Sequence, residues 1–161
     1  MARIKRGDVQ AVFEAFGGGG GAILRHRDAS PGSPADFLGS HGAIRPFARW
    51  DGRQFDAADW HVILIADIEG GDSTFTKHDA EKIMDTLEVR FDLDGAPLET
   101  SRTAVKRFLR PELFDLEEAY YFQEGRLIAP FELAAGEHEL HCVVTAEAEV
   151  VFENTIHFLI E

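Results

Sequence analysis

One stretch of the sequence alternates regularly between apolar and charged side chains and then turns. In residues 87–98, "LEVRFDLDGAPL", every second side chain from Leu87 to Leu93 is apolar and the residues between them are charged. Successive side chains of a β-strand point to opposite faces, and Asp-Gly is a preferred pair for a two-residue hairpin turn. The stretch therefore predicts a half-buried strand that turns at Asp94-Gly95.

Other segments after Ala43 also have strand patterns. Residues 60–68, "WHVILIADI", are apolar on both faces, as in a strand that is covered on both sides. The last third of the chain contains "EEAYYFQEGRL", "GEHELHCVVTA", "EVVFE" and "NTIHFLI", with Gly125, Gly136 and Asn154 near the breaks between them. Short strands with polar turns between them favour an antiparallel β-sandwich.

One helix interrupts this series of strands. In "TFTKHDAEKIMDTL", residues 74–87, Thr76 and Asp79 have the spacing of a capping box. One helical face is apolar, with the i, i+3, i+4, i+7 spacing of an amphipathic helix: it consists of Ala80, Ile83, Met84 and Leu87. The sequence therefore predicts a short helix inserted in a mainly β domain over residues 43–161.

Residues 1–42 have a different composition. Val9, Val12, Phe13 and Phe16 have the spacing of one helical face, which predicts a short N-terminal helix; a strand with Val9 and Phe13 on one side is the alternative. Five glycines follow at 17–21, without the Gly-Lys-Ser/Thr of a phosphate loop, so we interpret them as a hinge. Residues 28–42 are rich in Pro, Gly and Ser and predict a connector.

Charge restricts the classes of partner. The chain has 29 acidic and 16 basic residues and a formal charge of -13, which disfavours binding to nucleic acid and to anionic membranes. Cys142 is the one cysteine, which excludes an intramolecular disulfide and a Cys-rich metal site. No long apolar run follows the basic start, so the sequence as written predicts a cytoplasmic protein; a secreted protein whose signal was removed would show the same sequence.

The Asp-Gly turn and a later "FELAAGEHELHCVV" together resemble bacterial immunoglobulin-like and fibronectin-type modules over about residues 60–161. In those modules a strand is introduced by a Leu-x-x-Gly-x-His-x-Leu motif, here Leu133, Gly136, His138 and Leu140. A fainter similarity is to the small β subunits of bacterial C-glycoside deglycosidases, which have the same motif order. The first resemblance implies an immunoglobulin-like sandwich, and the second implies an accessory subunit of an enzyme.

Histidines are the candidate catalytic and metal-binding residues. If the apolar residues of their strands point inward, His141 and His157 point outward, and in a β-hairpin they would be neighbours. Such a pair could bind a divalent metal with Glu139 or Glu153, whereas two ordinary surface histidines are the alternative. No cofactor is predicted from any other motif.

Acidic and aromatic clusters give further candidates. Asp67, Glu69 and Asp72 in "DIEGGD" could hold calcium in a turn between strands. Large aromatic residues near charges can stack on a sugar or anchor a protein, and these candidate contacts are Trp50, Arg53, Trp60, Tyr120 and Tyr121. Tyr120 and Tyr121 are expected on opposite faces of one strand.

Two classes of function follow. The first is a non-catalytic binding or accessory-subunit module that contacts a protein partner, a second copy of itself or a carbohydrate-like small ligand. The alternative is a small lyase or hydrolase with His61, His141 or His157 as general base and Asp56 or Asp59 as its acidic partner. The enzyme hypothesis requires these histidines to converge with one of the aspartates in one pocket.

Overall fold

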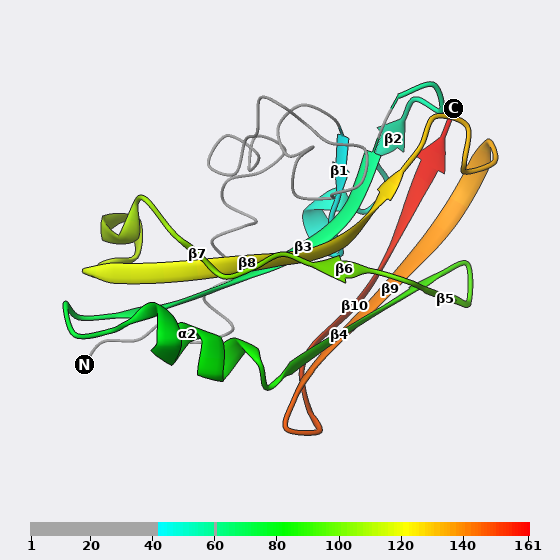
Figure 1. The fold of residues 1–161 in the computed structure, drawn as a ribbon. Helices are drawn as coiled ribbons and strands as arrows, with labels where there is room; N and C mark the ends of the chain where they lie inside the picture. The colour runs from blue at the N-terminus through cyan, green and yellow to red at the C-terminus, as the bar shows by residue number, and fades with distance from the viewer. Residues whose placement is uncertain (1–41, 60) are drawn as a thin grey trace.

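The computed structural model describes residues 42–59 and 61–161, which form two β-sheets packed as a sandwich (Figure 1). The predicted helix at residues 9–16, the glycine run, most of the connector and Trp60 lie outside the described residues. The mainly β class is confirmed. No described helix is long and apolar enough to cross a membrane.

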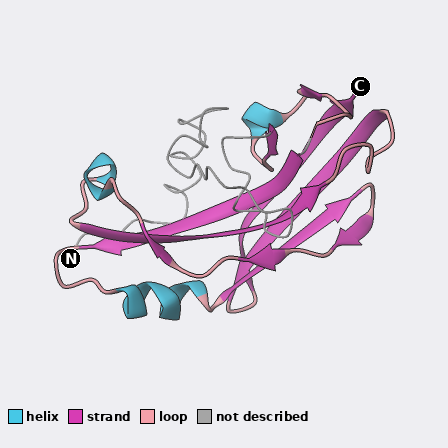
Figure 2. Ribbon diagram, turned by 45° about the horizontal axis from the view of Figure 1, so that its top comes forward, coloured by secondary structure: helices cyan, strands magenta, loops and turns pink. Residues whose placement is uncertain are grey.

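The first sheet has the order β1 (Gly42–Ile44), β3 (His61–Gly71), β8 (Glu118–Ile128) and β6 (Ser101–Arg102), and β7 (Lys106–Arg107) also pairs with β8. The second sheet has the order β2 (Gln54–Phe55), β10 (Glu149–Ile160), β9 (Gly136–Ala146), β4 (Leu87–Leu93) and β5 (Ala96–Leu98). Figure 2 shows both sheets with the helices at their margins.

Six of the described strand pairs are antiparallel, as the sandwich prediction expects, and two are parallel. β1 pairs with β3 and β2 pairs with β10 in parallel. Both β1 and β2 are short edge strands. Between β1 and β3 the chain passes through the 3-10 helix η3 (Ala48–Trp50) and through β2 on the other sheet. This crossover brings the chain back in the same direction, which parallel pairing requires.

The helix α2 (Lys77–Met84) begins where the sequence predicts. The Thr76 hydroxyl accepts a hydrogen bond from the Asp79 backbone N–H at 3.2 Å, and the Asp79 carboxylate accepts one from the Thr76 N–H at 2.9 Å. Ala80 and Met84 are buried, and the helix packs against β3 and β8 (Figure 1). The capping box and the apolar face are therefore confirmed.

The alternating strand at residues 87–93 is also confirmed. Leu87 and Phe91 are buried, while Glu88 and Arg90 between them are exposed. Asp94 and Gly95 have φ angles of 53° and 81°, and they join Leu93 to its partner Ala96. Positive φ at both positions is the geometry of the hairpin turn that the Asp-Gly pair favours.

β8 runs through Gly125, as the predicted strand segment at 117–127 does, whereas the predicted break at Asn154 is absent, because β10 continues through it. At Gly125 a Cβ atom would lie 2.1 Å from the Ile63 carbonyl oxygen, so glycine permits a close approach between strands here rather than a turn. Asn154 pairs with Cys142 in the β9–β10 ladder, and its side chain donates to the Pro46 carbonyl at 2.9 Å. The irregularity of β10 lies instead between Val150 and Phe152.

Candidate functional site

His141 and His157 lie on the exposed face of the second sheet, on the paired strands β9 and β10. In this pairing His141 is opposite Thr155 and His157 is opposite Glu139. Their side chains are 31% and 58% exposed. The expected hairpin therefore forms, and the two histidines are diagonal neighbours on its outer face.

Each of these rings lies between two carboxylates. His141 Nε2 is 2.8 Å from Glu153 Oε2, and its Nδ1 is 3.6 Å from a carboxylate oxygen of Asp92. His157 Nε2 is 3.2 Å from Glu139 Oε2, and its Nδ1 is 3.7 Å from Asp51 Oδ1. The rings therefore belong to two separate groups of surface polar side chains. Within residues 42–59 and 61–161, no group of three or more His, Cys, Asp and Glu side chains could hold a metal ion.

His61 lies elsewhere in the molecule. Its ring is buried and packs against Phe55, which in turn contacts Phe158 of the second sheet. His61 Nε2 lies 2.6 Å from the backbone carbonyl of Asp56, not from its carboxylate. His61 therefore faces the interior, while His141 and His157 face solvent on the second sheet.

The two candidate acidic partners of the histidines have other surroundings. Asp56 and Asp59 are exposed. The Asp56 carboxylate accepts a hydrogen bond from the Ala58 N–H at 2.8 Å, which closes a local turn. The three histidines and two aspartates therefore do not converge in one pocket, which is what the enzyme hypothesis requires.

The acidic segment at 67–72 is not a turn. Asp67 and Glu69 belong to β3 and are only 8% and 1% exposed. Asp72 follows the strand, and its carboxylate accepts hydrogen bonds from the backbone N–H and the hydroxyl of Thr74, which lower the pKa of Asp72. The sequence placed these residues in a flexible turn because it could not show that the buried strand extends to Gly71.

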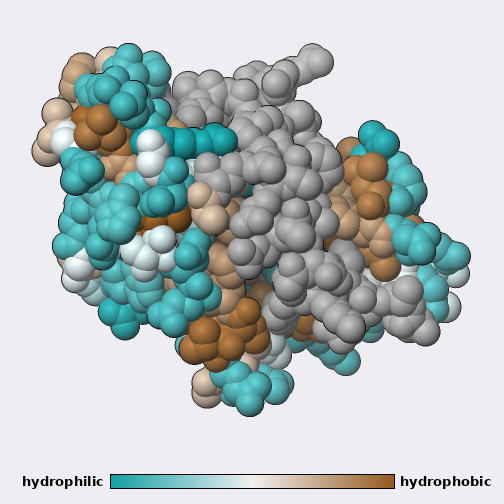
Figure 3. All heavy atoms as spheres, turned by 180° about the vertical axis from the view of Figure 1, so that it is seen from behind, coloured by the Kyte–Doolittle hydropathy of each residue, from teal (hydrophilic) through white to brown (hydrophobic). Residues whose placement is uncertain are grey.

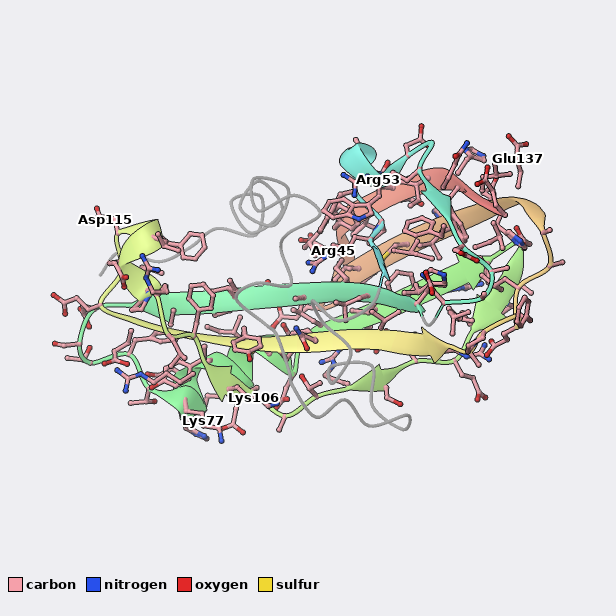
Figure 4. The ribbon with its side chains drawn as sticks, turned by 90° about the horizontal axis from the view of Figure 1, so that it is seen from above. Arg45, Arg53, Lys77, Lys106, Asp115 and Glu137 are labelled. Carbon is pink, nitrogen blue, oxygen red and sulfur yellow. The ribbon has the colours of Figure 1, made fainter. Side chains whose placement is uncertain are left out.

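Trp50 lies in the core and is 1% exposed. The guanidinium carbons of Arg53 and Arg45 lie 4.9 Å and 5.6 Å from the centre of a Trp50 ring, and Figure 4 shows both arginines in this part of the molecule. Burial lowers the pKa of Arg45 to about 10. Because these cations cover the indole, Trp50 does not present an open face for stacking on a ligand.

Tyr120 and Tyr121 point to opposite faces of β8, as the alternation predicts. Tyr120 contacts Phe75 and Tyr121 contacts Phe108. Both tyrosines are partly buried against the core, and burial raises the pKa of Tyr121. Their rings therefore contribute mainly to packing on the two sides of the strand.

A polar cleft lies near the edge of the sandwich. It has a volume of about 610 Å³ and is lined by Pro97, Glu99, Thr100, Ser101 and Arg126. The described residues of its lining include no histidine or aromatic side chain, so they offer neither a histidine base nor a stacking surface. None of the described histidine, aspartate or aromatic candidates lines it, and Trp60 lies outside the described residues.

The surface feature that sequence reasoning missed is the loop at residues 106–116, which we call the η4 loop after its 3-10 helix η4 (Pro111–Phe114). Leu109 is 80% exposed and Leu113 is 45% exposed. Seen from behind, hydrophobic side chains reach the surface at this end of the molecule and at the tip of the β9–β10 hairpin (Figure 3). No sequence pattern predicts this exposure, because apolar residues in a short loop have no periodicity.

Comparisons with known proteins find only weak structural similarity to this chain. No protein-family model and no curated protein matches the sequence. The crystal structure of the cysteine protease inhibitor EhICP2 from Entamoeba histolytica is similar with a TM-score of 0.33 and 9% identity, over 74% of this chain and 93% of that chain. An endo-beta-1,4-mannanase from Thermotoga petrophila is similar with a TM-score of 0.31 and 13% identity, over 69% of this chain and 18% of that chain. Likeness at this level does not bear on function.

Proposed function

We propose that this chain is a non-catalytic binding or accessory-subunit module that contacts a protein partner through the η4 loop. The observation that carries the proposal is the exposure of Leu109 and Leu113 on one short loop. Two exposed leucines on a loop are costly to hydrate and gain free energy when a partner covers them. The fainter similarity of the sequence to the small β subunits of bacterial C-glycoside deglycosidases supports an accessory-subunit role.

The loop is fixed at both ends, which suits a contact surface. Phe108 is 1% exposed and Leu116 is 8% exposed, and both pack into the core. The Phe108 N–H donates to the Ala119 carbonyl at 2.8 Å, and the Leu116 N–H donates to the Pro111 carbonyl at 3.1 Å. A loop that is already ordered loses less conformational entropy on binding than a flexible one.

Two arginines of the loop are paired with carboxylates, one within the loop and one on β8. Arg110 Nε lies 2.6 Å from Glu112 Oε1, and this hydrogen bond lowers the pKa of Glu112. Arg107 lies 3.4 Å from the Glu118 carboxylate. On a protein with a formal charge of -13, such a neutralised surface repels an acidic protein less than the rest of the molecule does.

The geometry gives less support to the other hypotheses. A histidine-based enzyme needs its base and acid in one pocket, and the candidate residues are dispersed. The described aromatic candidates for carbohydrate stacking offer no open face, because Trp50 is buried under two arginines and Tyr120 and Tyr121 pack against the core. We therefore propose that the function is to bind a protein partner.

Replacing both leucines with serine tests the proposal. Leu109→Ser/Leu113→Ser should leave the fold intact, because both side chains are exposed, and should remove the apolar contact. The matched control is Val150→Ser/Val151→Ser at the β9–β10 hairpin, where the valines are 59% and 38% exposed.

Tagged forms of the full chain would be expressed in the source cell, and co-purifying proteins would be quantified by mass spectrometry. We expect the wild type and the hairpin control to retain the same partner, and the loop variant to retain about tenfold less or lower, as loss of a central apolar contact does. Equal retention by the loop variant, or no partner with the wild type, would refute the proposal. Light scattering of the purified protein would show whether that partner is a second copy.

A further inference from the structure

The connection between β8 and β9 holds an exposed phenylalanine in a backbone conformation that this residue rarely adopts. Phe131 is 74% exposed and has a φ angle of 61°. Positive φ is uncommon for any residue except glycine and is unfavourable for a bulky side chain. The protein therefore bears two costs at this position, a strained backbone and a hydrated aromatic ring.

Neighbouring groups keep this conformation in place. The Phe131 N–H donates to the Ala57 carbonyl at 2.7 Å, and the Glu132 N–H donates to the Ala129 carbonyl at 3.1 Å. The Glu132 carboxylate accepts from the Ala129 N–H at 3.3 Å and from Arg126 at 2.7 Å. These contacts fix the backbone on both sides of Phe131, so they also fix the direction in which its side chain projects from the backbone.

The fold itself gains little from a phenylalanine here. Glycine would adopt the same φ without strain, and a polar side chain would be better hydrated at this exposure. Strained residues of this kind are often found at binding surfaces, where the conformation is prepared before the ligand arrives. A ring that is already oriented gives a partner an aromatic anchor at low entropic cost.

Exposed acidic residues flank Ala57 in the chain, the residue to which the Phe131 backbone bonds. Ala57, which accepts the hydrogen bond from Phe131, lies between the exposed residues Asp56 and Asp59 and donates its own N–H to the Glu161 carbonyl. The nearby cation, Arg126, is already paired with Glu132. A partner that covers Phe131 therefore needs positive charge around an apolar pocket.

We propose that Phe131 anchors a second protein-contact surface and inserts into an apolar pocket of a partner protein that is rimmed by lysine or arginine. The acidic surroundings exclude a nucleic-acid backbone as that partner. This surface is distinct from the η4 loop. In Figure 4 Asp115, which follows η4, and Glu137, at the start of β9 close to Phe131 in the chain, lie at opposite ends of the described molecule.

The first test separates an anchor from a structural residue. Phe131→Gly removes the ring and relieves the backbone strain, so we expect its urea unfolding midpoint to equal or exceed that of the wild type. Phe131→Tyr keeps an aromatic ring and serves as the conservative control. A lower midpoint for Phe131→Gly would show that the ring stabilises the fold itself, and this result would overturn the proposal.

The second test identifies what lies over the ring. The photoreactive phenylalanine analogue p-benzoyl-phenylalanine would replace Phe131 in the full chain, with a matched substitution at Val150, and both proteins would be irradiated in the source cell. We expect one protein to cross-link from position 131 and not from position 150, with lysine or arginine flanking the cross-linked segment. Asp56→Asn/Asp59→Asn should reduce the yield several-fold.

Three outcomes of this second test would overturn the proposal: no cross-link specific to position 131, a cross-linked segment without basic residues, or a cross-link to a second copy of this chain. Repeating the irradiation with Leu109→Ser/Leu113→Ser separates this surface from the η4 loop. Cross-linking from position 131 should persist in that variant, because the two surfaces are distinct. Loss of the cross-link would contradict their separation.

Discussion

At the scale of single residues, His138 lies between two hydrogen-bond acceptors. Its Nδ1 is 2.7 Å from the Asp94 carboxylate, its Nε2 is 2.6 Å from the Ala134 carbonyl, and its ring stacks on Phe158. A neutral imidazole has a single N–H, so only the protonated ring can donate to both acceptors. Burial by itself lowers the pKa of His138, but the hydrogen bonds to Ala134 and Asp94 and the Asp94 charge outweigh it and raise the pKa.

The raised pKa makes stability depend on pH. Protonated His138 stabilises the fold fully below its ordinary pKa of 6.5, and this contribution is lost as the pH rises through the raised folded value. For Asp94, burial raises the pKa, but hydrogen bonds from Glu139 and His138 and the His138 charge lower it below 3.8. Its contribution is present above pH 3.8 and is lost as the pH falls through the lowered folded value.

We therefore expect His138→Gln to lower the free energy of unfolding most at about pH 4 to 6. At alkaline pH this loss should be smaller by about 1 kcal/mol. Urea denaturation at several pH values measures this difference. Asp94→Asn is the matched variant, because asparagine also tolerates positive φ but lacks the charge, and it should weaken the pH dependence. A destabilisation by His138→Gln that does not change with pH would contradict the assignment of a protonated ring.

At the scale of structural elements, Arg102 joins parts of both sheets. It donates to Glu124 Oε1 at 2.7 Å, to the Met84 carbonyl at the end of α2 at 3.1 Å, and to the Leu87 carbonyl at the start of β4 at 2.8 Å. Its guanidinium carbon lies 4.4 Å from the centre of the Phe122 ring. Thr100 donates to the other Glu124 oxygen at 2.8 Å, so both oxygens of this carboxylate have donors.

Removing the Arg102 side chain should destabilise the fold, because Glu124 is 8% exposed and would remain as a buried charge without its main partner. We expect Arg102→Ala to lower the free energy of unfolding by about 3–5 kcal/mol. Arg102→Lys should rescue it only in part, because an ammonium lacks the planar fork. The control is Arg90→Ala, whose side chain is 67% exposed beside Asp92 and should cost less than about 1 kcal/mol. If Arg102→Ala and Arg90→Ala lower the free energy of unfolding equally in urea denaturation, Arg102 does not hold the two sheets together.

Elements with a local signal were predictable from the sequence. The capping box at Thr76 and Asp79 and the turn at Asp94-Gly95 depend on residues that are close in the chain, and both form. The continuity of β10 through Asn154 was not predictable, because the Asn154 side chain bonds to the carbonyl of Pro46, which is far away in the chain. The parallel pairing of β1 with β3 and of β2 with β10 likewise depends on the route of the chain between the sheets.

At the scale of the whole molecule, the candidate site residues were only partly predictable. The outward positions of His141 and His157 follow from strand alternation and are observed. The burial of Trp50 and the exposure of Leu109 and Leu113 depend on how distant segments pack, which composition and periodicity do not encode. Phe131 is a similar case, because its backbone geometry is set by Ala57, which is far away in the chain.

Contact with a protein partner through the η4 loop is the central claim. Amide hydrogen exchange tests it most directly, measured by mass spectrometry on the purified chain alone and on the chain with its co-purified partner. We predict that exchange in residues 108–116 slows by about tenfold or more in the complex, while exchange at the tip of the β9–β10 hairpin is unchanged. Unchanged exchange in residues 108–116, with slowing confined to other segments, would contradict the claim.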